Sequence, residues 1–302
     1  EHPRPPPGDF MRVALGISYS GARYSGFQRQ SDAPSVQEEL EKVLSRIADE
    51  KIEIACAGRT DAGVSAFGQV IHFDASKKRK ETAWTMGVNV FLPPDISVDW
   101  CRFVPDDFHA RFSALSRTYR YVILNRPLRS ALFPEGITHF HFRLDEHLME
   151  EGGQYLLGEN DFTSFRSSEC QSRTPWRRVD RLTVRRTGDF VVVEIKANAF
   201  LHHMVRNIVG SLFLVGMGRK KPEWMRELLL SKDRTLAGMN APPNGLFLAG
   251  VEYPERFGLP GVGDGPLFFP FAALQNVPHD HSGINAVQQH IGAFLIQLRL
   301  GQ

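Results

Sequence analysis

Asp61 is the side chain of this sequence with the best setting for chemistry. It lies in a loop between two strand-like segments, within the stretch AGRTDAGVSA at 57–66. Gly58 and Gly63 flank the triplet 59–61, so the loop can turn tightly and present a carboxylate outward. Such a carboxylate can attack or deprotonate a substrate. A turn-forming or capping aspartate gives the same pattern, so the loop alone leaves both interpretations open.

Arg206 is the second candidate because its surroundings are apolar. The segment 200–215 predicts a helix that is hydrophobic on nearly every side and therefore buried. An unpaired guanidinium would be very costly there, so we expect Arg206 to pair with a carboxylate or phosphate. Snorkelling at a helix end is the alternative, which a position in the middle of the predicted helix disfavours.

Metal ligation is not expected. His202 and His203 are adjacent, and adjacent helical residues point ~100° apart, so one ion cannot easily use both. The same holds for His279 and His281 in the tail. Asp61 belongs to no P-loop, zinc-ligand spacing or nucleophile elbow.

The composition is that of an ordinary globular protein. Of 302 residues, 42% are apolar and 23% are charged, and the length favours two domains or two fused subdomains. No apolar run approaches the ~20 residues that cross a bilayer, which excludes a membrane span. Three scattered cysteines suit a reducing cytoplasm, so we expect a cytoplasmic protein: Cys56, Cys101 and Cys170.

The charge is unevenly distributed although the net charge is only +2. Between positions 166 and 186 seven arginines stand against Glu169 and Asp180. Such an excess of positive charge can bind along the phosphate backbone of a nucleic acid. An ordinary solvated surface explains it equally well. The arginines are Arg166, Arg173, Arg177, Arg178, Arg181, Arg185 and Arg186.

Periodicity places these residues on an α+β fold with a mixed or antiparallel sheet. Ser35 and Glu38 form a capping-box pattern at the start of a helix. The expected strands are 13–19, 52–57, 70–73, 96–103, 118–124, 182–186, 190–197 and 246–253. The expected helices begin near 35, 81, 145, 200 and 223. Residues 1–10 are interpreted as a flexible leader, 11–113 and 114–254 as two αβ subdomains, and 255–302 as a linker and tail of unknown role.

Several stretches occur in an order typical of one family. They are GFQRQ at 26–30 with SVQ at 35–37, GRTDAGV at 58–64 with GQVIHF at 68–73, ARFSA at 110–114, YRY at 119–121, GENDFTSF at 158–165 and NAFLHHMVRN at 198–207. From about Met11 to about Pro254 the chain thus resembles the bacterial TruA family (tRNA pseudouridine synthase A). One such motif would be weak evidence, whereas five or more in order are specific.

The resemblance implies a role for each matching residue. Asp61 falls on the family's catalytic aspartate, Arg206 on the buried arginine that pairs with it, and Tyr119 on an active-site tyrosine whose ring can lie against the uracil. Arg59 falls on a residue thought to help push the target base out of the helix, and Leu246 on an apolar residue of the base pocket. For tRNA phosphates we add Arg177 and Arg178, on charge alone.

The resemblance also implies a reaction, a fold and partners. The reaction is the isomerisation of uridines 38, 39 and 40 in the tRNA anticodon arm, with no cofactor or metal. The fold is two RRM-like (ferredoxin-like) αβ subdomains joined into one mainly antiparallel sheet with a central catalytic cleft. The partners are tRNA and a second copy of the chain in a homodimer. Two alternatives stay open: a non-catalytic tRNA-binding or chaperone protein of the same fold, and a hydrolase that releases uracil.

Three positions depart from the family's usual pattern. Ser65 stands where histidine is common, Phe27 where tryptophan is common, and Ser20 where aspartate is frequent. None of them falls on Asp61, Tyr119 or Arg206, so the expected activity is unaffected and only finer substrate contacts are in question.

Overall fold

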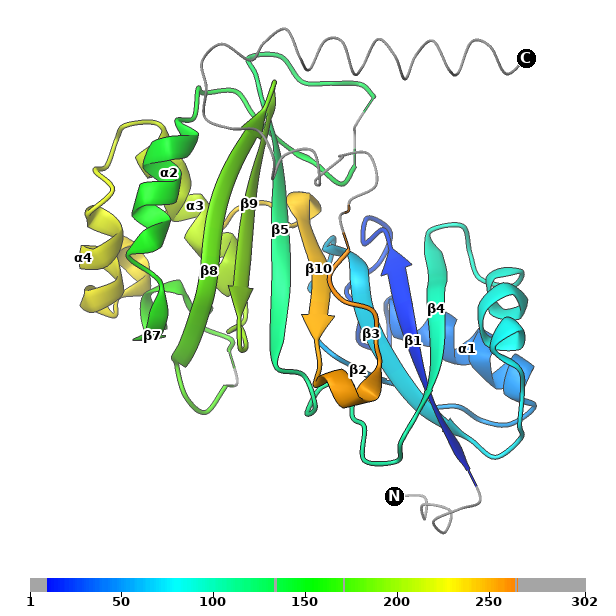
Figure 1. Cartoon of the computed structure of the whole chain (residues 1–302). Coiled ribbons are helices and arrows are strands. Elements are labelled where there is room, and N and C mark those ends of the chain that lie inside the picture. Colours follow the sequence, from blue (N-terminus) through cyan, green and yellow to red (C-terminus); the bar gives the residue numbers. More distant parts are fainter. Residues whose placement is uncertain (1–9, 133–134, 171, 264, 266–302) are drawn as a thin grey trace, which may run out of the picture.

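One continuous sheet organises the chain. The structure is a computed structural model that describes residues 10–132, 135–170, 172–263 and 265 (Figure 1). The strand order is β4-β1-β3-β10-β5-β9-β8-β7, with β2 paired to β3 and β6 to β5. The predicted α+β class and mainly antiparallel sheet are confirmed. The strands are β1 Met11–Tyr19, β2 Ala55–Cys56, β3 Ser65–Ala75, β4 Ile96–Val104, β5 Ser116–Asn125, β6 Thr138–Phe140, β7 Gly158–Asp161, β8 Trp176–Thr187, β9 Phe190–Ala197 and β10 Leu246–Glu252.

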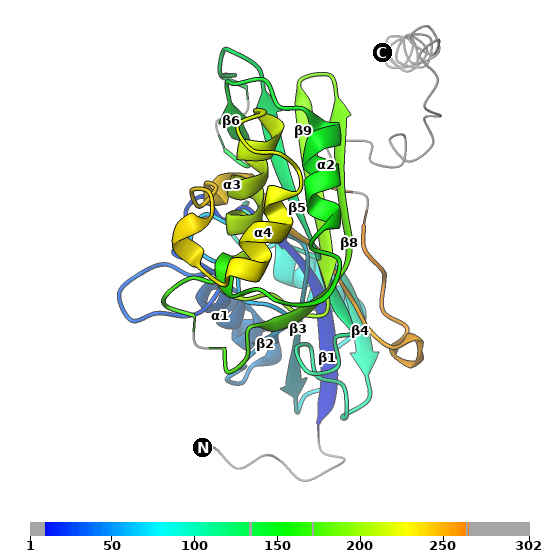
Figure 2. The same ribbon diagram turned by 90° about the vertical axis from the view of Figure 1, so that its left-hand side faces the viewer.

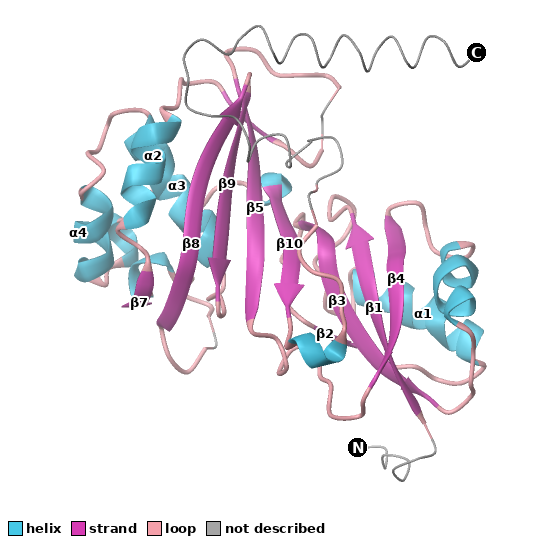
Figure 3. Ribbon diagram, viewed as in Figure 1, coloured by secondary structure: helices cyan, strands magenta, loops and turns pink. Residues whose placement is uncertain are grey.

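The helices gather on one face of this sheet, as Figures 2 and 3 show. One group covers the half that contains β1, and another covers the half that contains β9. The longer helices are α1 Val36–Ala48, α2 Glu146–Gln154, α3 Met204–Gly216 and α4 Trp224–Ser231. Ala83–Gly87 is a π-helix, and the short 3-10 helices are Thr163–Phe165, Arg234–Leu236, Pro243–Gly245 and Glu255–Phe257. No helix in the described ranges is long and apolar enough to cross a bilayer.

Strand β10 joins the two halves. It runs parallel to β3, where Leu248 pairs with Ala66, and antiparallel to β5, where Leu248 pairs with Tyr119. A strand from late in the chain therefore lies between the strand that follows the Asp61 loop and the strand that carries Tyr119. On the helix face, Leu248 and Tyr119 belong to the main hydrophobic core.

Helix α1 begins as predicted, whereas α3 does not. The Ser35 hydroxyl accepts the Glu38 backbone N–H at 3.2 Å, which confirms the N-terminal cap. The predicted helix 200–215 begins only at Met204, because His203 has φ = +60°, a left-handed conformation that does not continue a right-handed helix. Arg206 therefore lies in the first turn of α3 rather than in its middle.

The described part of the predicted linker packs on the sheet. Arg120 of β5 donates from Nη1 to the carbonyls of Gly263 (2.8 Å) and Gly265 (2.6 Å). Its Nε pairs with Glu194 at 2.7 Å. In both ribbon views this segment crosses the face opposite to the helices. The predicted leader (apart from residue 10) and the predicted tail beyond 265 lie outside the described residues.

Candidate active site

A buried glutamine fixes the start of the loop that carries Asp61. Gln69 of β3 is fully buried, donates to the Gly58 carbonyl at 2.7 Å and accepts the Gly58 N–H at 3.4 Å. Its amide also donates to the Tyr19 hydroxyl at 3.3 Å. Both backbone groups of Gly58 are thereby satisfied by one side chain, which fixes where the loop leaves the sheet.

Thr60 fixes the next part of the loop. Its buried hydroxyl lies 2.8 Å from the Tyr19 hydroxyl, and its carbonyl accepts the Phe27 N–H at 3.0 Å. Asp61 follows, and its own carbonyl accepts from Val64 at 3.1 Å, which closes the turn. The backbone on both sides of Asp61 is thus held while 28% of its side chain stays exposed.

Two departures from the family pattern fall on supporting positions. Phe27 is buried and packs against Tyr19 with ring centroids 5.8 Å apart. The Ser65 hydroxyl accepts the Gly21 N–H at 3.0 Å. Both side chains therefore support the loop through contacts of their own.

Three side chains converge on the Asp61 carboxylate. Arg206 Nη1 lies 3.8 Å from Oδ2, His203 Nε2 lies 3.4 Å from Oδ2, and His202 Nε2 lies 3.1 Å from Oδ1. The expected carboxylate partner of Arg206 is therefore Asp61. Oδ1 faces one of these groups and Oδ2 faces two, so Oδ1 has more freedom to meet a substrate.

Arg206 is anchored by the backbone as well. Its Nε donates to the Ala241 carbonyl at 2.7 Å, and the Ala241 N–H donates back to the Arg206 carbonyl at 3.1 Å. Burial lowers the pKa of Arg206 from its usual value, and the negative charge of Asp61 opposes that shift. A guanidinium stays charged under these conditions, so a positive charge faces the Asp61 carboxylate.

His202 and His203 do not point apart, contrary to the prediction from helical geometry. Both precede the first residue of α3, so the helical angle between neighbours does not apply, and their rings stack at 4.0 Å. Together with Asp61 they offer ligand atoms within 4.8 Å of one another. A divalent cation placed there would lie beside the Arg206 guanidinium, whose charge repels it, so this set does not fit a metal site well. The two histidines are visible in the sequence. Their contact with Asp61 could not be predicted from it, because that contact depends on the left-handed turn at His203.

Tyr119 and Leu246 lie in the wall beside the loop. Tyr119 is 9% exposed, its ring meets Phe200 edge to face at 4.9 Å, and its hydroxyl approaches Gly58. Burial and then the charge of Asp61 raise the pKa of Tyr119, so its hydroxyl stays protonated at neutral pH. Leu246 is buried and pairs with Tyr121, while Leu248, on the same face of β10, pairs with Tyr119.

The arginines predicted to contact RNA differ in their exposure and in the partners they already have. Arg59 is exposed, and no ion pair of it is found with the described residues. Arg178 is exposed and pairs with Asp180 at 2.8 Å. Arg177 is half-buried, and its guanidinium donates to Thr174, Trp176 and Ser172, which ties its own loop together.

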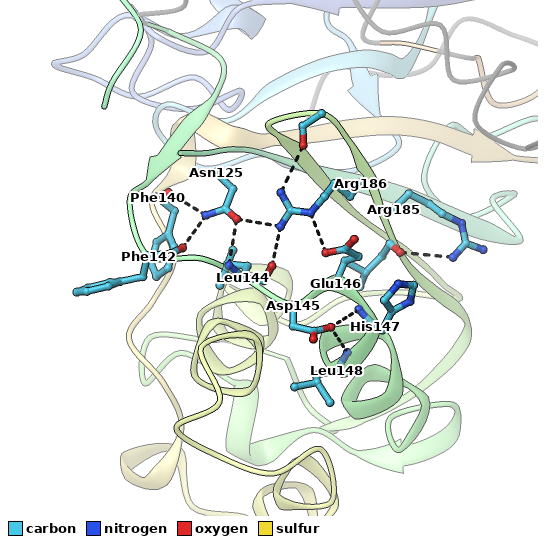
Figure 4. A network of polar contacts seen from close by, with 12 residues as sticks. Asn125, Phe140, Phe142, Leu144, Asp145, Glu146, His147, Leu148, Arg185 and Arg186 are labelled. Atoms are coloured by element: carbon cyan, nitrogen blue, oxygen red, sulfur yellow. Dashed lines mark hydrogen bonds and ion pairs between the residues drawn. The ribbon is translucent and has the colours of Figure 1, made fainter. Parts of the chain in front are cut away.

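Three of the seven arginines in the cluster are neutralised by acids distant in the sequence. Arg181, Arg185 and Arg186 pair with Glu194, Glu150 and Glu146 at 2.7 to 2.9 Å. Figure 4 shows Arg186 between Glu146, Asn125 and the Leu144 carbonyl at the start of α2. The local excess counted along the sequence therefore overstates the positive field of this surface.

Two hollows of the described surface lie away from Asp61. One, of about 480 Å³, lies between α2 and β8, and the other, of about 420 Å³, lies beside α1. Asp61 lines neither of them. The central catalytic cleft stays a prediction.

The likeness of the chain to one solved RNA–protein complex is weak. Superposition on the "Structure of H/ACA RNP bound to a substrate RNA containing 2'-deoxyuridine" gives a TM-score of 0.35 at 13% identity, over 68% of this chain and 44% of that one. A likeness this low carries no argument.

Sequence relatives are much closer. The chain is 60% identical to "tRNA pseudouridine synthase A" of Colwellia psychrerythraea, over 85% of this chain and all of that one. It is 59% identical to the protein of the same name from Vibrio parahaemolyticus, over 86% of this chain and 98% of that one. The model of the family described as tRNA pseudouridine synthase matches residues 16–113 and 153–254. With most of its length covered in this way, the chain belongs to the tRNA pseudouridine synthase family.

Proposed function

We propose that this chain converts uridines 38, 39 and 40 of the tRNA anticodon arm to pseudouridine, with Asp61 as the catalytic carboxylate. Membership of the family makes it an isomerase of tRNA uridines. The observation that carries the finer proposal is the setting of Asp61: partly exposed, 3.8 Å from a buried guanidinium and beside the buried, protonated Tyr119. A carboxylate held this way is oriented beside a positive charge and open on one side.

The reaction rearranges bonds without changing the oxidation state. The N-glycosidic bond breaks, the uracil turns and a C–C bond forms from C5 to the ribose. C5 then loses its proton and N1, freed from the ribose, gains one, so the product is an isomer of the substrate. Asp61 can begin it in two ways, which both stay open: attack on the ribose C1′, or removal of a ribose proton to give a glycal. Tyr119 is protonated, so its hydroxyl serves as a hydrogen-bond donor and its ring as a wall for the base.

The target base must leave its stack before Asp61 can reach the ribose. Unstacking costs a few kcal/mol and is cheapest in a loop or at a stem end, which suits the anticodon arm. Arg59 is exposed, two residues before Asp61, and it is the side chain best placed to occupy the vacated stack or to contact a phosphate. Recognition through phosphates and RNA shape is compatible with three adjacent target positions.

One assay separates the proposal from its alternatives. The protein is incubated with unmodified tRNA, and pseudouridine in the anticodon arm is quantified for wild type, Asp61→Asn and, as a matched control, Asp189→Asn in the exposed β8–β9 turn. We expect product from wild type and the control and none from Asp61→Asn. Binding without product favours an RNA-binding protein, free uracil favours a hydrolase, and full activity of Asp61→Asn contradicts the role of Asp61.

Two further proposals come from the family resemblance and the composition. We propose that the chain acts as a homodimer with a tRNA touching both subunits, and that it is cytoplasmic. Light scattering of the purified chain tests the first, because a monomer mass at assay concentration contradicts it. Fractionation of cells that produce the chain tests the second.

A further inference from the structure

The segment 238–242 is locked onto helix α3. A Cβ at Gly210 would lie 1.6 Å from the Met239 carbonyl oxygen, so the two backbones approach as only glycine allows. The Gly238 N–H donates to the Ser211 hydroxyl at 3.0 Å. With the reciprocal hydrogen bonds between Arg206 and Ala241, these contacts fix where residue 240 points.

That position brings an amide against the ring of His203. The Asn240 Nδ2 lies 3.1 Å from His203 Nδ1. An amide nitrogen can only donate, so Nδ1 must accept and carries no proton. A neutral imidazole has one ring proton, which is therefore on Nε2, the atom 3.4 Å from Asp61 Oδ2.

Burial of His203 favours this neutral form. Burial lowers its pKa; Asp61 opposes that shift, His202 and Arg206 reinforce it, and Glu169 opposes it weakly. The opposite orientation of the Asn240 amide would put the ring proton on Nδ1. His203 would then either turn a lone pair toward the Asp61 carboxylate or become a cation beside Arg206, and both cost free energy.

We propose that Asn240 is a positioning residue that holds His203 as its Nε2–H tautomer, so that a neutral N–H faces Oδ2 of Asp61 and keeps the carboxylate oriented. This inference rests on the proposed catalytic role of Asp61. The left-handed backbone of His203, at φ = +60°, places the ring between the Asn240 amide and the Asp61 carboxylate. Neither residue touches the substrate in this assignment.

A double-mutant cycle tests the tautomer directly. Glutamine at position 203 carries an N–H at about the place of Nε2 and has no tautomers. In wild type, Asn240→Ala should lower kcat roughly fivefold to tenfold, the weight of one hydrogen bond, with little change in tRNA affinity. His203→Gln should keep most of the activity, whereas the shorter His203→Asn should not. In the His203→Gln background, Asn240→Ala should have no further effect on kcat.

The controls separate positioning from folding. Asn160→Ala removes another half-buried amide, which binds the carbonyls of Leu156 and Leu157 far from the site, and should leave kcat unchanged. Each variant's thermal midpoint is measured. An equal loss of kcat from Asn240→Ala in the wild-type and the His203→Gln backgrounds overturns the proposal, since Asn240 would then only support its segment.

A second measurement does not depend on any variant being active. Ring ¹⁵N resonances of labelled protein, with His203 assigned by its loss in His203→Gln, should show the proton on Nε2 at neutral pH. A proton on Nδ1 overturns the inference. The proposed function is tested separately. If the Asp61→Asn variant is active, the proposed function is contradicted, whichever tautomer His203 has. If that variant is inactive and the His203 proton is on Nδ1, only the role of Asn240 is refuted.

Discussion

At the scale of single residues, Asp61 has more neighbours in the structure than the sequence predicted: His202 and His203 as well as Arg206. The need of a buried Arg206 for a carboxylate follows from elementary electrostatics and could be predicted without coordinates. The contacts of His202 and His203 with Asp61 could not, because they depend on a left-handed residue in a segment whose pattern is helical. Local backbone exceptions of this kind leave no periodic signal.

Replacing Arg206 tests its pairing with Asp61. Arg206→Ala should lower kcat on the order of tenfold to a hundredfold, because Asp61 loses the positive charge that orients it. The affinity for tRNA should change much less. Arg206→Lys keeps the charge but cannot bind the Ala241 carbonyl and face Asp61 at once, so it should rescue only part of kcat. A defect confined to affinity would contradict the ion pair.

Gln69 should affect both stability and turnover, although it does not contact the substrate. Gln69→Leu leaves the N–H and the carbonyl of Gly58 without their partner, at a cost of about 1–3 kcal/mol in unfolding free energy. The loop that carries Asp61 should loosen, so kcat should fall as well. Denaturant unfolding and turnover are measured together. Unchanged turnover in a destabilised variant would show that Gly58 can move without moving Asp61.

At the scale of elements, long patterned segments were predictable and short ones were not. Helix α1 begins at its predicted cap, and β9 spans its predicted residues 190–197. Strands β6 and β7 were missed because three or four residues cannot display a period. Strand β8 begins at Trp176, six residues before the prediction, because its polar first half is recruited by pairing with β7 and the end of β9.

The close packing of α3 gives an element-scale prediction. Gly210→Ala places a methyl group on the Met239 carbonyl and should push the segment 238–242 off the helix. The cost should be roughly 1–3 kcal/mol, which lowers the thermal midpoint by several degrees. Turnover should fall too, because Arg206 loses its anchor at Ala241. Gly261→Ala, where a new Cβ meets no atom within 4 Å, is the matched control and should leave both quantities unchanged.

At the scale of the whole molecule, charge counting along the chain is a poor guide to the surface. The acids that neutralise Arg181, Arg185 and Arg186 come from β9 and α2, and only the folded sheet brings them together. By contrast, the joining of two αβ halves into one sheet was predicted from the resemblance, since neither periodicity nor composition indicates which strands pair at the junction.

Salt dependence measures which arginines contact RNA. Arg178→Ala should weaken tRNA binding and reduce the slope of log Kd against log salt by about one, if this side chain exchanges Asp180 for a phosphate. Arg177→Ala should weaken binding as well, and should also loosen the loop that its guanidinium ties together. Arg185→Ala is the control, because it removes an equally ion-paired arginine of the same cluster that is not a predicted RNA contact. Equal slopes for Arg178→Ala and wild type would remove the residue from the binding surface.

The place of β10 has a consequence for the way the protein is made. Strand β3 leaves the ribosome roughly 170 residues before β10, the strand that separates it from β5. Until then, the edge of β3 beside the Asp61 loop lacks its partner, and Tyr119 has no Leu248 beside it. We expect nascent chains that end before Leu246 to be cut by protease within β3 and to make no pseudouridine. The nascent chain would thus become active only when β10, close to the end of the described residues, has been synthesised.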